Sequence, residues 1–237
     1  MIDHGQLHRD GYVLLRGAIP ADRLDDLRAA FEAGFKPSNQ WPVPRGADWR
    51  HSWLDLDPHV QAVCRLPEVL LVVGELIGER FFLAQAEGRD PMAGGGHQML
   101  HRDFSAQRLG DTVIALAYLD DYGPSNGATR IVPGSHRLAQ GEPPFDFSDE
   151  SKSVQLSGSA GDIVIFDADL VHGASLNPTG APRRSILITY FAEPLHAMHQ
   201  QTAKLRGVRM DTTDRFDPTG LPQAPEGAGL THEVTLE

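Results

Sequence analysis

The feature that most constrains the fold is a succession of short apolar segments between residues 80 and 194, each bounded by turn residues. Their sequences are RFFLAQAEG, HQMLHRDFS, DTVIALAYLDD, ATRIVPGSHR, SVQLSGSAGDIVIFDADLVHGAS and RRSILITYFAEP. Segments of this length, with a period of two or continuous apolar character, are typical of β-strands, and SNGA and PGSH supply tight turns. The spacing favours a mainly β fold, a double-stranded β-helix (jelly-roll, cupin-like) barrel with flanking α-helices, over a parallel α/β sheet.

Residues before these strands are expected to flank the barrel. The sequence DGYVLLRGAI, from residue 10 to 19, has the composition of a strand, and Pro20 opens an amphipathic helix after it. A second helix is predicted over about residues 58–78, interrupted near Pro67 because proline lacks the amide hydrogen that a helix needs. Residues 36–57 hold three prolines and no sustained period, which predicts a long ordered loop.

The length of 237 residues and the apolar content suit one domain with a sizeable core. We expect this domain to consist of an N-terminal strand and helices over residues 10–79 and a barrel over about residues 80–195. Residues 196–237 are expected to form a lid or tail, because their last thirty or so residues are rich in Gly, Pro and Thr.

Charge and cysteine usage narrow the classes of partner. The net charge of -11, without clustered Lys and Arg, argues against nucleic acid. The apolar run Val69–Val73 is too short to span a bilayer, and the N-terminus lacks a secretory signal pattern, so no membrane association is expected. The single cysteine, Cys64, excludes an internal disulfide and fits a reducing compartment. We therefore expect a cytoplasmic protein with a small-molecule substrate.

Candidate metal ligands lie in the segment QMLHRDFS. Alternate side chains of a strand share a face, so His101 and Asp103 are expected on one wall and Arg102 on the other. The best candidate for a third ligand is His172, because it follows the strand GDIVIFDADLV at a turn, where strand ends line the mouth of a barrel. Two histidines and one carboxylate on one face of a metal are the donor set of non-haem Fe(II) oxygenases. Such a site leaves positions for a co-substrate and O2.

A candidate for holding a 2-oxo acid co-substrate is Arg183. The acid chelates the metal through its keto oxygen and near carboxylate, and its far carboxylate then needs a cation such as a planar guanidinium. Arg183 lies eleven residues after His172, and alternation places it on one face with Ser185, so that both can hold the co-substrate. Arg184 is then expected to point away, although a one-residue bulge would exchange the two arginines.

Four motifs in order resemble a known family. HRD (101–103), SNGATRIVPGSHR (125–137) and GDIVIFDADLVHGAS (161–175), with the arginine eleven residues after the last histidine, resemble the phytanoyl-CoA dioxygenase family. The N-terminal DGYVLLRGAIPADRLDDLRAAF is a usual opening of that family, so the resemblance covers residues 8–193. It implies a double-stranded β-helix that uses Fe(II), 2-oxoglutarate and O2 and releases succinate and CO2.

The resemblance also implies roles for individual residues. The implied iron ligands are His101, Asp103 and His172. The residues implied or expected around 2-oxoglutarate are Arg183, Ser185, Gln98 and Gln85. Because Asp103 is present, where related halogenases carry a small residue, hydroxylation or another oxidation such as desaturation is favoured over halogenation. The expected substrate is a small metabolite, either a natural-product intermediate or a small polar acid.

Alternatives from other classes stay open. One is a metal-containing, cupin-like protein that binds a small ligand without oxygenase activity. Another is a zinc site on His97 and His101, although HQMLH lacks the glutamate of the helical HExxH motif and its surroundings are typical of a strand.

The loop over residues 36–57 carries side chains whose role the sequence leaves open. Its tryptophans, Trp41, Trp49 and Trp53, are expected either to line the substrate mouth or to pin the loop to the barrel. Arg45 and Arg50 in the same loop are candidate anion contacts.

Overall fold

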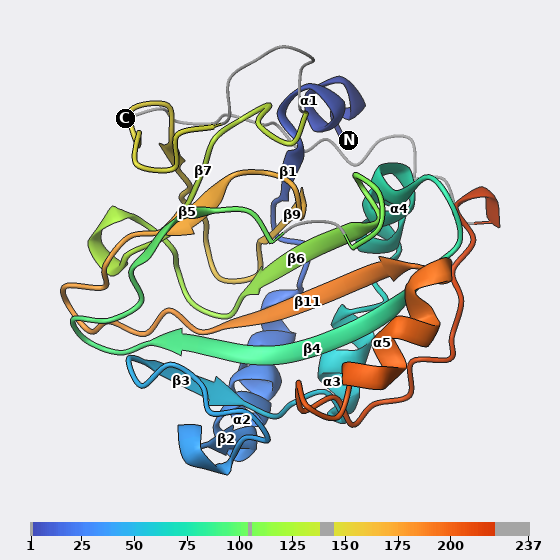
Figure 1. Cartoon of the computed structure of the whole chain (residues 1–237). Helices are drawn as coiled ribbons and strands as arrows, with labels where there is room; N and C mark the ends of the chain where they lie inside the picture. The colour runs from blue at the N-terminus through green and yellow to red at the C-terminus, as the bar shows by residue number, and fades with distance from the viewer. Residues whose placement is uncertain (1, 104–105, 138–144, 221–237) are drawn as a thin grey trace.

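Strands form two antiparallel sheets in the computed structural model, which describes residues 2–103, 106–137 and 145–220 (Figure 1). Within these residues the larger sheet contains, in spatial order, β1 (Tyr12–Leu15), β9 (Ile163–Asp167), β6 (Thr112–Tyr118), β11 (Ser185–Ala192), β4 (Phe81–Pro91), β3 (Trp49–Ser52) and β2 (Phe35–Lys36). The smaller sheet contains β5 (Gln98–His101), β10 (His172–Ala174), β7 (Thr129–Ile131) and β8 (Val154–Gln155). Neighbouring strands are antiparallel throughout both sheets.

The two sheets face each other across a pocket that residues of both sheets line. This arrangement confirms the predicted fold class, a mainly antiparallel β structure of the double-stranded β-helix type with flanking helices. In the described part of the chain, strand pairing does not close the two sheets into one continuous barrel. The pocket therefore has two different sheets as its walls.

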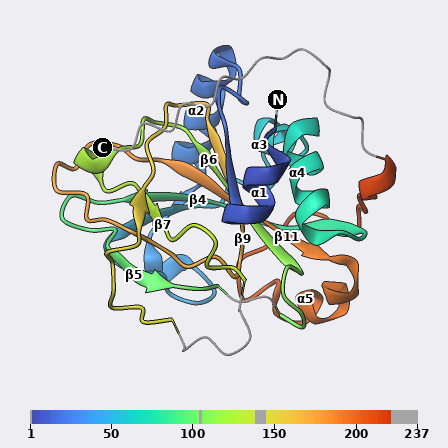
Figure 2. The ribbon, with the colours of Figure 1, turned by 90° about the horizontal axis from the view of Figure 1, so that it is seen from above.

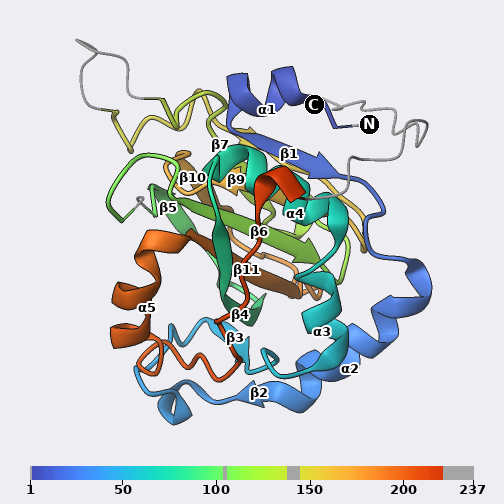
Figure 3. The same ribbon diagram turned by 90° about the vertical axis from the view of Figure 1, so that its right-hand side faces the viewer.

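Helices pack against both faces of the large sheet. The helices are α1 (His4–Asp10), α2 (Leu24–Gly34), α3 (Pro58–Val63), α4 (Pro67–Ile77) and α5 (His196–Thr202). Short 3₁₀ helices cover Ala21–Arg23, Ser38–Gln40, Pro124–Asn126, Glu193–Leu195 and Pro218–Gly220. Figure 2 shows α2, α3 and α4 on one side of the large sheet and the small sheet on the other. Figure 3 shows α5 across the large sheet from α2 and α3.

The sequence explains how these helices begin, end and pack. Pro58 occupies the first turn of α3, whose cap Asp57 accepts hydrogen bonds from backbone amides, and Pro67 begins α4 as a separate helix. The interruption predicted near Pro67 is therefore confirmed. The buried side chains of α2 recur at helical spacing, as predicted: Leu24, Leu27, Ala30 and Phe31. They join the core cluster that also contains residues of α4 and of the large sheet.

Three local predictions were incomplete. The predicted loop over residues 36–57 contains β3, whose residue Trp49 pairs with Pro91 of β4. The predicted strand over residues 10–19 is shorter, and α1 precedes it, capped by Asp3 and ended by Gly11 at a positive φ of 81°. The expected C-terminal lid or tail contains α5, and its residues 221–237 lie outside the described part.

No helix among the described residues is both long enough and apolar enough to cross a membrane.

Candidate active site

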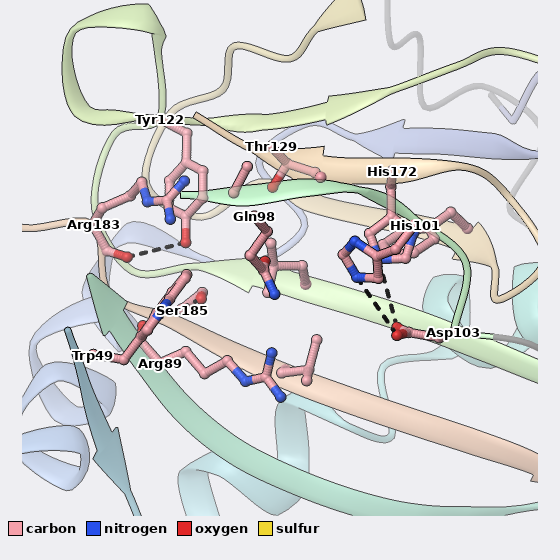
Figure 4. Close-up of a pocket in the computed structure, with 15 residues that line it drawn as sticks. Trp49, Arg89, Gln98, His101, Asp103, Tyr122, Thr129, His172, Arg183 and Ser185 are labelled. Carbon is pink, nitrogen blue, oxygen red and sulfur yellow. Dashed lines mark hydrogen bonds and ion pairs between the residues drawn. The ribbon is translucent and has the colours of Figure 1, made fainter. Parts of the chain in front are cut away.

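Most of the predicted site residues meet in a pocket between the sheets (Figure 4). The small sheet lines it with Gln98, Thr129, His101 and His172. The large sheet lines it with Trp49, Arg89, Leu116, Phe166, Ser185 and Leu187. Asp103, Tyr122 and Arg183 lie just outside the strands and complete the wall. Figure 4 shows Arg183 at one end of the pocket, the two histidines with Asp103 at the other, and Ser185, Gln98 and Arg89 between them.

Two histidines and one aspartate form a cluster at the end of the pocket away from Arg183. His101 of β5 and His172 of β10 pair directly across the two strands, and their ring centroids lie 4.4 Å apart. Oδ1 of Asp103 lies 3.7 Å from Nε2 of His101, and Oδ2 lies 3.5 Å from Nε2 of His172. One ligand atom from each residue lies within 4.8 Å of the others. The cluster therefore has the donor types and the compactness of a site for one metal ion.

The backbone fixes which nitrogen of each histidine faces the cluster. Nδ1 of His101 lies 2.7 Å from the carbonyl oxygen of Met99, and Nδ1 of His172 lies 2.9 Å from that of Leu170. A carbonyl oxygen only accepts, so Nδ1 of each ring carries the proton and donates it. Each Nε2 then keeps its lone pair, and both lone pairs are available to a metal.

Asp103 completes the cluster from just beyond β5. Its amide donates to the carbonyl of Ala168 at 3.1 Å, while Arg102 points the other way and donates to the carbonyl of Ser135 at 2.7 Å. Burial raises the pKa of Asp103, but the neighbouring His172 and His101, and more weakly Arg89, outweigh it and leave the pKa below its usual value. The carboxylate is therefore ionised at neutral pH, as a metal ligand must be.

Arg183 forms the opposite end of the pocket. It is 2% exposed, and its guanidinium lies between the rings of Trp49 and Tyr122, with Cζ 5.6 and 5.2 Å from their centroids. NH1 donates to the carbonyl of Gly127, whereas the buried Nε has no partner among the described residues. Burial lowers the pKa of Arg183. A guanidinium nevertheless stays charged at neutral pH.

Hydrogen bonds to the backbone of Arg183 fix its position. Its amide donates to Oδ1 of Asp90 at 3.0 Å, and its carbonyl accepts from the hydroxyl of Tyr122 at 3.1 Å. Arg184 points away and pairs with Asp120, its Nε lying 2.9 Å from Oδ2. Arg183 is thus the arginine that faces the pocket.

The structure brings together most, but not all, of the predicted residues. Ser185 and Gln98 line the pocket, but Gln85 does not. The side chain of Gln85 donates to Glu87 at 2.9 Å and accepts from Arg206 at 3.0 Å. Gln85 therefore belongs to a neighbouring polar cluster with Glu87 and Arg206. The predicted position of Gln85 at the pocket was wrong.

Of the loop tryptophans, only Trp49 lines the pocket in the described structure. Trp41 and Trp53 pack edge to face within the loop, with ring centroids 5.1 Å apart, and the guanidinium of Arg209 lies over the ring of Trp53. Arg45 pairs with Glu87 at 2.9 Å, and Arg50 pairs with Glu32 at 2.5 Å.

Sequence reasoning missed Arg89, which lines the pocket from β4. Its signal is the polar alternation of Gln85, Glu87 and Arg89 along an otherwise apolar strand. Strand pairing places Arg89 opposite Ser185, and Nε of Arg89 donates to Glu87 at 2.7 Å. The charge of Arg89 also helps to lower the pKa of Asp103.

A mainly antiparallel β fold with two histidines and a carboxylate at one end of a pocket has the donor set of the non-haem Fe(II) oxygenases. The profile of one such family, phytanoyl-CoA dioxygenase (PhyH), matches residues 7–185. The chain belongs to the phytanoyl-CoA dioxygenase family. The predicted family is thereby confirmed, and relatives of this chain are named as Fe(II)/2-oxoglutarate-dependent or other dioxygenases.

Relatives by sequence carry dioxygenase names. The Fe(II)/2-oxoglutarate-dependent dioxygenase nvfF of Aspergillus novofumigatus is 37% identical over 105 residues, which cover 40% of this chain and 34% of nvfF. The ectoine dioxygenase of Sphingopyxis alaskensis is 24% identical over 226 residues, covering 78% of this chain and 73% of that enzyme. The match to nvfF thus spans only about a third of its length.

Solved structures share the fold. HygX from Streptomyces hygroscopicus, with nickel and 2-oxoglutarate bound, has a TM-score of 0.67 at 17% identity and covers 81% of this chain and 88% of its own. The epimerase SnoN from nogalamycin biosynthesis has a TM-score of 0.65 at 21% identity, with 94% of each chain covered. At these identities the likeness establishes the fold.

Proposed function

We propose that this protein is a non-haem Fe(II)- and 2-oxoglutarate-dependent dioxygenase that hydroxylates, or otherwise oxidises, a small-molecule metabolite. In this proposal His101 and His172 hold the iron through Nε2, and Asp103 holds it through its carboxylate. The bound iron and 2-oxoglutarate supply the activation of O2, with release of succinate and CO2. The protein supplies the positions of the reactants, the charges around them and the exclusion of water.

The observation that carries the proposal is the buried, unpaired cation at Arg183. Its side chain forms no ion pair with any residue that the structure describes, and Nε has no hydrogen-bond partner there. An uncompensated buried charge is unfavourable, so this end of the pocket favours an anionic ligand. The distal carboxylate of 2-oxoglutarate provides that charge and matches the planar fork of the guanidinium.

The remaining residues of the pocket have distinct parts in the proposal. Ser185 and Gln98 lie between Arg183 and the histidine cluster, where their polar groups can orient the co-substrate. Leu116 and Leu187 form an apolar section of the wall, and the ring of Phe166 lies 4.9 Å from that of His172. This apolar lining limits the access of water and strengthens the electrostatic contacts made there.

Ligands of similar folds support a small-molecule substrate. HygX is described with hygromycin B bound, and SnoN with nogalamycin RO bound. The carboxylate of Asp103, at the position expected to be small in a halogenase, supports hydroxylation or another oxidation without chloride.

The first test is an anaerobic titration of the metal-free protein with Fe(II) and then with 2-oxoglutarate, followed by visible absorption. Formation of the weak metal-to-ligand charge-transfer band of a chelated 2-oxo acid is the expected result. Its absence, despite tight metal binding, would contradict the proposal. Binding of both ligands without any succinate release would instead favour the ligand-binding protein considered above.

The neighbouring arginines provide a matched pair of variants. Arg183→Leu should raise the concentration of 2-oxoglutarate needed for half-saturation by roughly 100-fold, because a charge-assisted bidentate contact is lost. Arg184→Leu removes an equal charge one residue away, where the side chain pairs with Asp120 outside the pocket. An equal effect of both substitutions would show that Arg183 has no specific part in binding 2-oxoglutarate.

A further inference from the structure

We propose that Arg89 binds a carboxylate of the substrate, so that the enzyme acts on a small organic acid. This inference rests on the proposed function, because it assumes that 2-oxoglutarate occupies the pocket between Arg183 and the histidine cluster. It adds a second cationic subsite to that pocket and assigns it to the substrate.

Arg89 presents unpaired donors to the pocket. Its side chain is 29% exposed, and Figure 4 shows the guanidinium extending along the pocket between Ser185 and Asp103. Nε donates to Oε1 of Glu87 at 2.7 Å, and the two terminal nitrogens have no hydrogen-bond partner in the described part of the chain. The terminal edge of the guanidinium is therefore available for a bidentate contact with a carboxylate.

Glu87 holds Arg89 in place but does not depend on it. The carboxylate of Glu87 is 2% exposed and also accepts from NH2 of Arg45 and from Nε2 of Gln85, both at 2.9 Å. Arg45 alone therefore supplies Glu87 with a paired cation. A role of Arg89 limited to neutralising Glu87 is thus unnecessary, which leaves its charge for a ligand.

The surrounding cluster carries an excess of positive charge. Arg206 joins it through Gln85, since NH1 of Arg206 donates to Oε1 of Gln85 at 3.0 Å. Arg45, Arg89 and Arg206 are thus linked by hydrogen bonds to a cluster with one carboxylate, that of Glu87, among the residues that the structure describes. A net positive, half-buried cluster at the pocket wall favours an anion.

The layout of the pocket favours the substrate over the co-substrate as the source of that anion. In the proposed function, the distal carboxylate of 2-oxoglutarate faces Arg183 and its near carboxylate faces the metal. Both of its charges therefore already have a partner. Arg89 lies on the wall between these two partners and remains for a further carboxylate.

The test measures binding directly, with Zn(II) in place of iron and with 2-oxoglutarate present, so that no turnover occurs. Small organic acids, each paired with its own primary amide, are titrated while tryptophan fluorescence is followed, because Trp49 lines the pocket. Acids should bind at least about 30-fold more tightly than their amides, since the amide lacks the charge that Arg89 contacts. Arg89→Gln should remove this preference.

Two further variants make the result specific. Arg28→Gln on α2 is the matched control, because Arg28 is 31% exposed, pairs with Asp25 and does not line the pocket. It should keep the full preference for acids. Arg89→Lys keeps the charge but loses the planar fork, so it should retain the preference with binding weakened roughly tenfold, and it replaces Arg89→Gln if that variant does not fold.

The outcomes separate the subsite from the proposed function. Equal binding of acids and amides, or binding of neither, would overturn the inference. So would an Arg89→Gln variant that binds 2-oxoglutarate more weakly but keeps the preference for acids, because Arg89 would then serve the co-substrate. Acids that bind through Arg89 but never accelerate succinate release by the Fe(II) enzyme would support the subsite and contradict the proposed function.

Discussion

His101 and His172 are direct partners across the antiparallel strands β5 and β10, and each ring donates from Nδ1 to the carbonyl two residues before it. The ladder sets the distance between the rings, and the carbonyls of Met99 and Leu170 set their rotation. Both Nε2 atoms are therefore oriented by the backbone. We infer that this part of the site is organised before a metal binds, so that metal binding requires little rearrangement.

This relationship predicts which histidines are needed for metal binding. His101→Ala or His172→Ala should each weaken Fe(II) binding by at least about 100-fold. Loss of a residue that only hydrogen-bonds to a metal ligand already weakens metal binding by up to about 100-fold, and these substitutions remove the ligand itself. Iron retained after anaerobic desalting measures the effect. His97→Ala, at an exposed position in the same segment, is the control and should retain iron. Loss of iron in His97→Ala but not in His172→Ala would instead support a site built on HQMLH.

Local periodicity was sufficient to place the residues whose position depends on their own strand. His101 and Asp103 were assigned to one face by alternation alone, and the structure places their side chains 3.7 Å apart. Ser185 and Arg183 followed from the same reasoning. Their assigned roles as ligands and binding residues remain predictions that the variants above test.

Positions that depend on pairing between distant strands could not be predicted in this way. Alternation places Gln85 and Arg89 on one face of β4, but the two lie four residues apart, about 13 Å at the rise of a strand. Only one of them can reach the pocket, and the register of β4 with β11 decides that it is Arg89. The strand β3 was missed because WRHS has no apolar alternation and becomes a strand only by pairing with β4.

The turn at Gly127 links local backbone geometry to the co-substrate end of the pocket. Gly127 has a φ of 79°, and a Cβ there would lie 2.4 Å from the carbonyl oxygen of Ser175. Its own carbonyl accepts from Arg183. Gly127→Ala should lower the free energy of unfolding by about 1–3 kcal/mol and weaken 2-oxoglutarate binding, because strain and the clash displace that carbonyl.

Gly17→Ala is the control for this prediction. Gly17 also has a positive φ, 56°, but a Cβ there would meet no atom within 4 Å. Gly17→Ala should lower the free energy of unfolding only through backbone strain, and it should leave 2-oxoglutarate binding unchanged. Chemical denaturation measures the stability of both variants, and titration with 2-oxoglutarate measures binding. Equal behaviour of the two would mean that the contact with Ser175 is relieved without moving Arg183.

Burial of His51 predicts that the stability of the fold depends on pH. His51 is 7% exposed, and both ring nitrogens lack a partner among the described residues. Burial lowers its pKa to about 4; the charge of Glu87 opposes this shift, whereas Arg89 and Arg45 add to it. The unfolded chain therefore binds this proton more readily, and the contribution to stability falls as the pH drops from about 6.5 towards 4.

His51→Phe tests this dependence, because a phenyl ring preserves the edge contact with Trp41 but does not titrate. Between pH 7.5 and pH 5 the wild-type protein should lose roughly 2 kcal/mol more unfolding free energy than the variant, which follows from a shift from about 6.5 to about 4. Burial also lowers the pKa of His199 to about 4, so His199 adds to the pH dependence of stability. Its contribution is the same in both proteins, and the comparison with the variant therefore isolates that of His51. Parallel pH profiles would mean that folding leaves the proton affinity of His51 unchanged.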